Sequence, residues 1–161
     1  MTQLRDYRDA LASLLTTDAT FIAAVQTALG QAVTNFVNSN RPLGEIAAGI
    51  YPCWVLEIGD GKAAPEANNS RESQTIGLSS QSFTHETHLA LVWMDNNRDA
   101  AANARADLPY LLTQLLLRNP MPGNACELAV LTDWQPDRAV NHPTQIWRAT
   151  VESLHTFPRA G

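Results

Sequence analysis

The histidines are the residues best able to bind a metal ion, and two of them lie close together in the chain. The segment His85-Glu-Thr-His88 superficially resembles a zinc-protease signature. That signature needs two histidines four residues apart on one face of a helix. Here the spacing is three, and the surrounding residues alternate like a β-strand, so the two rings are predicted to point to opposite faces. We therefore expect no metal site at these histidines.

A second candidate for metal binding is the run of polar residues that begins at Asp95. Asp95, Asn97 and Asp99 are spaced like the first ligands of a calcium-binding loop. Such a loop has glycine at its sixth position and glutamate at its twelfth. This chain has Ala100 and Ala106 at those positions. A turn followed by a helix cap explains the polar residues better than a calcium site does.

The residues that could act as nucleophiles or bases lack an activating arrangement. Cys53 and Cys126 lie in apolar, strand-like runs, where a thiol is more often inert packing than a reactive thiolate. We expect two buried free thiols and not a disulfide, although the sequence alone does not show whether they are neighbours. His155 is expected to be a satisfied histidine of the core or edge. Glu66 and Glu72 lie in a polar segment that offers no fixed geometry for acid–base work.

The chain also has neither a phosphate-binding loop nor a Gly-x-Ser-x-Gly elbow. We therefore predict that the protein is not an enzyme and uses no cofactor or metal. A small hydrolase is the least favoured reading. It would require His85, His88 or His155 in a pocket beside a carboxylate.

Composition describes one soluble domain that spans residues 1–161, with 45% apolar and 17% charged residues. The formal net charge of -5 argues against a sequence-specific nucleic-acid surface, which is normally basic. The first residues form no apolar signal segment, and no long uncharged apolar stretch follows. We expect a protein that is neither secreted through a cleaved signal nor inserted in a membrane.

Hydrophobic periodicity predicts the elements that hold these residues. Residues 1–40 read as a helical region with two helices, the second carrying an apolar stripe from Phe21 to Phe36. Strands are predicted at 51–58, 84–94, 126–134 and 146–157, and a helix that contains Pro109 is predicted between the second and third strands. Residues 59–82 read as a long polar loop. The fold class is α+β, with a four-stranded, mainly antiparallel sheet, helices on one side, and the order α-α-β-β-α-β-β.

The pattern within the strands predicts which side chains reach the core. Trp54, Trp93, Trp134 and Trp147 all fall in predicted strands, and most of them are expected to be buried. Tryptophan is also enriched in interface hot spots, so one or two could anchor a neighbouring subunit. An open sheet has two edges to protect, and pairing them between subunits is one solution.

Several local segments resemble the tail terminator (tail completion) proteins of long-tailed bacteriophages and related minor tail proteins. They are the strand entry Tyr51-Pro52-Cys53-Trp54-Val55, the alternating strand from Glu86 to Met94, the leucine-rich helix from Ala100 to Leu117 with its internal proline, and the final strand from Trp147 to Leu154. The resemblance covers roughly residues 50–157. The extra helix and the long loop depart from the shortest members of the family.

The resemblance implies a virion protein without catalytic residues. Such a subunit forms a ring, commonly a hexamer, that caps the tail tube and joins it to the head. The implied partners are other copies of the chain, the tail tube protein and the head connector proteins, with no membrane, although DNA could pass through the lumen. The implied location is the head–tail interface of the virion, after assembly in the host cytoplasm.

Family members commonly use loops and sheet edges for subunit contacts. The expected interface residues are Asp60, Lys62, Glu66, Arg71, Glu72, Phe83, Trp134 and Arg148. The departures from the shortest members leave open a head-completion or connector protein. A monomeric protein-binding adaptor is the alternative from another class.

Overall fold

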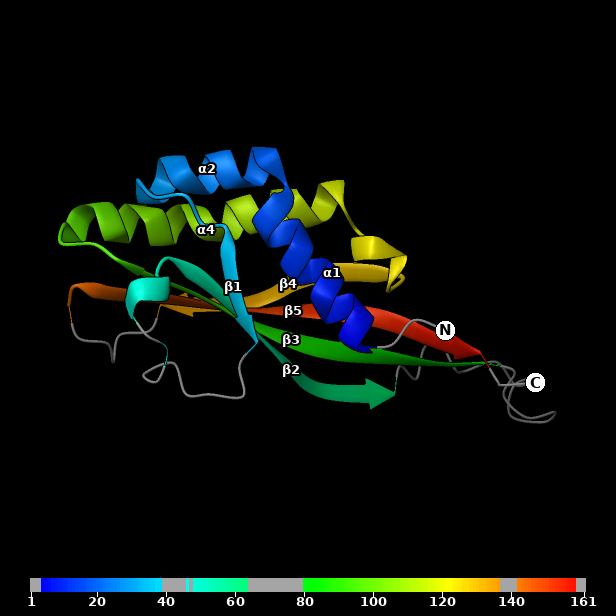
Figure 1. Ribbon diagram of the computed structural model, residues 1–161. Helices are drawn as coiled ribbons and strands as arrows, with labels where there is room; N and C mark the ends of the chain where they lie inside the picture. Colours follow the sequence, from blue (N-terminus) through cyan, green and yellow to red (C-terminus); the bar gives the residue numbers. More distant parts are fainter. Residues whose placement is uncertain (1–3, 39–45, 47, 64–79, 137–141, 159–161) are drawn as a thin grey trace.

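The computed structural model describes residues 4–38, 46, 48–63, 80–136 and 142–158 (Figure 1). Within these residues, three α-helices lie on one face of a sheet of five strands (Figure 1). The elements in chain order are α1 (Leu4–Thr17), α2 (Ala19–Leu29), β1 (Asn35–Asn38), η2 (Ala48–Ile50), β2 (Cys53–Ala63), β3 (Ser80–Met94), α4 (Arg98–Arg118), η3 (Pro122–Asn124), β4 (Leu128–Pro136) and β5 (Thr144–Pro158).

The sheet has the strand order β1-β2-β3-β5-β4. Neighbours pair antiparallel except β1, which runs parallel to β2. The α+β class and the helix-covered face are as predicted. The prediction of four strands is wrong, because β1 was missed.

The missing strand lies where the sequence predicted the end of the second helix. That helix, α2, stops at Leu29, and Gly30 caps it with a φ of 74°, a left-handed conformation that glycine adopts without steric cost. The chain then turns, and Phe36 and Val37 pair with Trp54 and Val55 of β2. The apolar stripe that seemed to continue to Phe36 therefore belongs to two different elements.

The strands β2 and β3 are longer than predicted. The predicted strand ends at residue 58, but β2 continues to Ala63 across a register shift between Ile58 and Gly61. This shift is a β-bulge, which inserts one extra residue and reverses the faces of those that follow. Residues 59–63 and 80–82 of the predicted loop are therefore strand, and residues 64–79 lie outside the described part.

The helix α4 contains Pro109 without ending there, as predicted. Asn97 caps its start, with its side-chain oxygen accepting from the backbone N–H groups of Asp99 and Ala100. At the start of α2, Asp18 plays the same role for Phe21 at 2.8 Å. The cap before α4 was predicted, because short polar residues before an apolar period satisfy helix N–H groups.

The main core fills the space between the helices and the sheet. Its largest fully buried side chains include Trp54, Trp93 and Trp147, together with leucines of α1, α4 and β3. A second, smaller cluster lies on the opposite face of the sheet and comprises Ile46, Cys53, Val55, Ala90, Val92 and Ile146. Residues of the two clusters alternate along β2, β3 and β5, as the side-chain period of a strand requires. The smaller cluster covers one end of the face that lacks helices.

Candidate functional site

The two histidines of the false zinc motif lie on opposite faces, as the strand alternation predicted. His85 is buried on the helix side, whereas His88 is exposed on the other side. His88 Nδ1 lies 3.3 Å from Thr150 Oγ1. In the described part of the chain, no three side chains of histidine, cysteine, aspartate or glutamate gather as a metal site would require.

Both thiols are buried and free, as expected. Cys53 belongs to the small cluster and Cys126 to the main core, so they lie on different faces of the sheet. Cys126 precedes β4 and is not part of it, contrary to the predicted strand boundary. Burial raises the pKa of each thiol to about 11, which leaves little of the reactive thiolate near neutral pH.

One serine and one histidine lie as close as a nucleophile and its base. Ser153 Oγ is 2.7 Å from His155 Nε2. Both side chains are almost fully buried, with exposed fractions of 1% and 3%, and the ring of Tyr7 from α1 meets His155 edge-on at 5.1 Å between centroids. A substrate has no path to this pair in the described structure, so His155 is the packed histidine that the sequence predicted.

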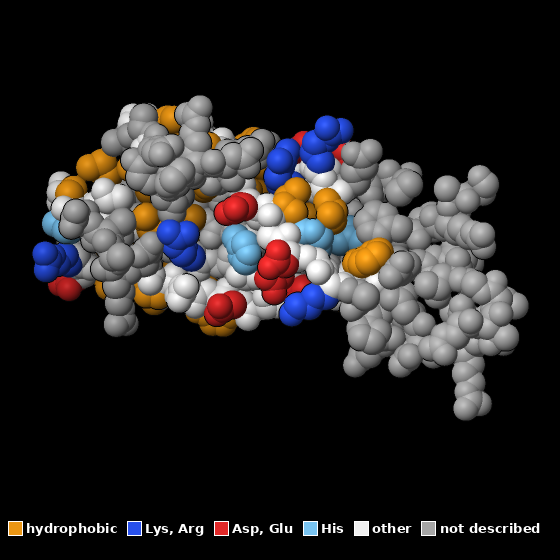
Figure 2. Space-filling view, turned by 90° about the horizontal axis from the view of Figure 1, so that it is seen from below, with side chains coloured by type: hydrophobic (Ala, Val, Ile, Leu, Met, Phe, Trp, Pro, Cys, Tyr) orange, Lys and Arg blue, Asp and Glu red, His pale blue; other side chains and the backbone are white. Residues whose placement is uncertain are grey.

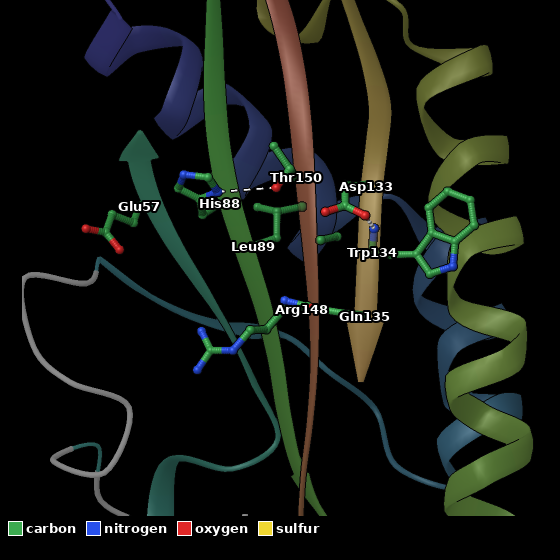
Figure 3. Close-up of a pocket in the computed structure, with 9 residues that line it drawn as sticks. Glu57, His88, Leu89, Asp133, Trp134, Gln135, Arg148 and Thr150 are labelled. Carbon is green, nitrogen blue, oxygen red and sulfur yellow. Dashed lines mark hydrogen bonds between the residues drawn. The ribbon is translucent and has the colours of Figure 1, made fainter. Parts of the chain in front are cut away.

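The face of the sheet that lacks helices carries a shallow hollow of about 370 Å³. Acidic, basic and histidine side chains gather on this face (Figure 2). Four side chains form a row across β2, β3, β5 and β4. In that order they are Glu57, His88, Thr150 and Asp133, and each is paired with the next. Arg148 lies beside this row, and the dashed contact in Figure 3 joins His88 to Thr150. The hollow is polar and open, which suits hydrogen bonding to a protein surface better than enclosing a small ligand.

Gly59 is required for the position of His88 in this hollow. A Cβ built on Gly59 would lie 2.5 Å from His88 Nε2 and 3.1 Å from the carbonyl oxygen of Glu86. The bulge in β2 thus brings backbone directly against the histidine ring. A glycine in a strand often marks such a close approach.

The outer strands leave two edges of the sheet without a described partner strand. Strand β1 pairs with β2 only as far as Leu56, so the outer side of residues 57–63 faces no described strand. On the other side of the sheet, β4 is the last strand. Its start is partly covered, because Ala129 N–H donates to the carbonyl of Pro120 at 2.8 Å. The outer side of residues 130–136 is the second open edge.

A bulge in β4 determines where Trp134 points. The register shifts between Leu131 and Asp133. Upstream, Val130 lies on the face without helices, 40% exposed; beyond the shift, Asp133 takes that face and Trp134 turns to the helix side. Figure 3 shows the indole directed toward α4. It remains 50% exposed, the most exposed of the four tryptophans.

The structure distributes the predicted interface residues over several places. Asp60 and Lys62 are exposed at the β2 edge, and Trp134 lies at the β4 edge. Arg148 is exposed in the hollow. Phe83 lies within the sheet, between Ala63 and His155. Glu66, Arg71 and Glu72 lie outside the described residues.

Sequence reasoning missed the exposed apolar residues of β4. Leu128 and Val130 are 45% and 40% exposed. Their alternation with buried Ala129 was a usable signal, since a strand with apolar residues on both faces indicates a second covered surface.

No described helix is long and apolar enough to cross a membrane.

Comparison with known proteins gives little similarity. No protein-family model matches this chain, and no curated protein matches it. Among solved structures, a chain of a structure described as the virion of a native gene transfer agent (GTA) particle is similar, with 11% identity and a TM-score of 0.46. The match covers 93% of this chain and 94% of that one. A similarity of this size supports no conclusion about function.

Proposed function

We propose that this chain is a structural subunit of a phage virion, that it assembles into a ring, and that the ring is a tail terminator. The observation that carries the proposal is the pair of open edges on opposite sides of one sheet. The resemblance of residues 50–157 to tail terminator proteins supplies the biological setting. No chemical reaction is part of this function.

The two edges have the geometry that a ring needs. A contact between two different surfaces of the same subunit repeats head to tail, and it closes into a ring if the rotation permits. The open parts of β2 and β4 span residues 57–63 and 130–136. Because β3 and β5 lie between them and every pairing from β2 to β4 is antiparallel, β4 runs opposite to β2. Pairing β4 of one subunit with β2 of the next would therefore be antiparallel.

The side chains at these edges complement one another. Lys62 pairs with Thr84 and Asp133 with Thr150, which places both on the face without helices. A cation and an anion would then face each other across the contact, which favours the correct partner and register. Trp134 would supply the apolar anchor that such interfaces commonly contain.

The proposed partners follow from a ring at the end of a tail tube: other copies of this chain, the tail tube protein and head connector proteins. The ring would lie at the head–tail interface of the virion, after assembly in the host cytoplasm. The net charge of -5 fits a lumen through which DNA passes without binding, because like charges repel.

Engineered disulfides test the edge contact directly. Asp60 and Gln135 are exposed on the two edges, and the native cysteines are buried. Oxidation of a D60C/Q135C double variant should give a ladder of covalent multimers that ends at the ring size. Each single variant is the matched control and should give no more than background dimers. Strong dimer formation by one single variant would show a two-fold contact instead and overturn this ring.

The native mass, measured by light scattering over a concentration series, and negative-stain imaging complete the test. Rings found at the ends of phage tail tubes would support a terminator, whereas rings bound only to connectors would indicate a head-completion protein. A monomer at every concentration that gives no ladder and caps no tubes would overturn the ring and favour the adaptor.

A further inference from the structure

A cluster of five polar side chains lies in the otherwise apolar main core, between α1 and the sheet. Tyr7 comes from α1, His85 and Thr87 from β3, and Ser153 and His155 from β5; each is at most 9% exposed. His85 pairs with Ser153 across the two strands, and Phe83 pairs with His155. The cluster therefore lies at one position along the sheet, directly beneath the N-terminal helix.

His155 is held between the helix and the neighbouring strand. The ring of Tyr7 meets it edge-on at 5.1 Å, and the ring of His85 does so from the other strand at 6.4 Å. Ser153 Oγ lies 2.7 Å from His155 Nε2 and donates at 3.3 Å toward the carbonyl of His85. One contact of α1 with the sheet is therefore made by a histidine.

The surroundings of His155 favour its neutral form. Burial is the largest cause that lowers its pKa from 6.5, and the neighbouring His85 acts in the same direction. The carbonyl of Ala125 and the carboxylate of Glu127 oppose this shift without reversing it. From α1, Tyr7 offers no negative charge, since burial raises its pKa to about 12. The thiol of Cys126 is also neutral, with its pKa raised to about 11.

We propose that this cluster is an acid-sensitive clasp, which holds the first half of α1 (residues 4–11) on the sheet near neutral pH and releases it in acid. A short helix has little stability apart from its packing. The sheet, by contrast, is held by fifteen paired positions between β3 and β5 alone. Protonation of His155 should therefore free the helix before the sheet opens.

The direction of the effect follows from proton linkage. Once released, His155 regains an ordinary pKa near 6.5, so below that pH the released state binds more protons than the docked state. Docking is complete above pH 6.5 and weakens as the pH falls toward the lower pKa of the docked state. At pH 5.0, a single histidine can shift the equilibrium by at most about 30-fold.

Hydrogen–deuterium exchange of the full chain tests the clasp. Exchange should be measured at pH 7.5 and 5.0 and corrected for the pH dependence of the intrinsic rates. We expect protection of residues 4–11 to fall relative to the centre of β3, by no more than about 30-fold. His155→Gln, which keeps hydrogen bonding but does not titrate, should abolish this difference. His88→Gln is the matched control, because His88 lies on the opposite, exposed face of β3, and it should leave the difference intact.

The proposal is overturned if α1 and β3 lose protection equally in the wild-type protein, since that would be global unfolding. It is equally overturned if His155→Gln retains the full pH dependence. Should His155→Gln fail to fold, titration of the His155 ring by NMR in the wild-type protein replaces it. An apparent pKa of 6.5 or higher in the folded protein would exclude the clasp, and a lower one would support it.

Discussion

Replacing Trp134 by alanine should weaken self-association through the β4 edge. Half of this side chain is exposed in the single chain, and a tryptophan buries about 150–250 Å², so about 100 Å² remains for a neighbour to cover. At about 25 cal/mol per Å², that area contributes about 2.5 kcal/mol. The dissociation constant of each subunit contact should then rise by roughly 60-fold.

Sedimentation velocity over a concentration series measures this change. Trp134→Phe keeps much of the apolar area and should lie between the wild-type protein and Trp134→Ala. Tyr110→Ala is the matched control, because Tyr110 is 65% exposed but belongs to α4 and to neither strand with an open edge. Circular dichroism should show each variant folded before the association constants are compared.

Two results would contradict a subunit contact through Trp134. If Trp134→Ala changed the dissociation constant by less than about threefold, under 1 kcal/mol, the indole would not be covered in the assembly. If Tyr110→Ala weakened association instead, the contact would lie on the helix layer. The subunits of the ring would then contact one another through α4 and not through the two open edges of the sheet.

Two further predictions concern helix capping and thiol protonation. Asp18→Ala should lower the free energy of unfolding by about 1–1.5 kcal/mol, because it removes the cap of α2 and an exposed ion pair with Arg118. Asp18→Asn keeps the cap and should cost only about 0.3 kcal/mol in urea unfolding; equal losses would contradict this account. Cys53 and Cys126 should react with a thiol reagent at pH 8 at least about 100-fold more slowly in the native protein than in urea, since burial raises the pKa of each to about 11. Rapid labelling of the folded chain would disprove that.

The parts of the fold that were predictable are those specified by local patterns. The alternation of Thr87, Leu89, Leu91 and Trp93 identified the buried face of β3, because the side-chain period of a strand is two. The capping residues identified where helices begin. Their physical cause lies within a few residues of the chain, so no knowledge of distant contacts was needed.

The parts of the fold that were missed depend on contacts with other strands, or on glycines that can either end a strand or form a bulge within it. Strand β1 has only four residues and ends at Asn38, whereas its partner β2 begins at Cys53. Phe36 was in phase with the preceding helix, so only Gly30 signalled a boundary. The predicted strand ends before Gly59, whereas Gly59 and Gly61 lie at a bulge within β2. Glycine serves both purposes, and only the partner strand distinguishes them.

The direction of Trp134 at the candidate site was also not predictable from the sequence. The sequence named Trp134 as a possible anchor, but strict alternation would put it on the same face as Val130. The β4 bulge moves it to the helix side. Bulges occur in both strands that carry an open edge, near Ile58 in β2 and near Leu131 in β4, within or beside the open stretches. Because a bulge increases local twist, it discourages flat strands from pairing there. A neighbour with matching twist can still pair, so we expect these edges to select another copy of this chain over unrelated strands.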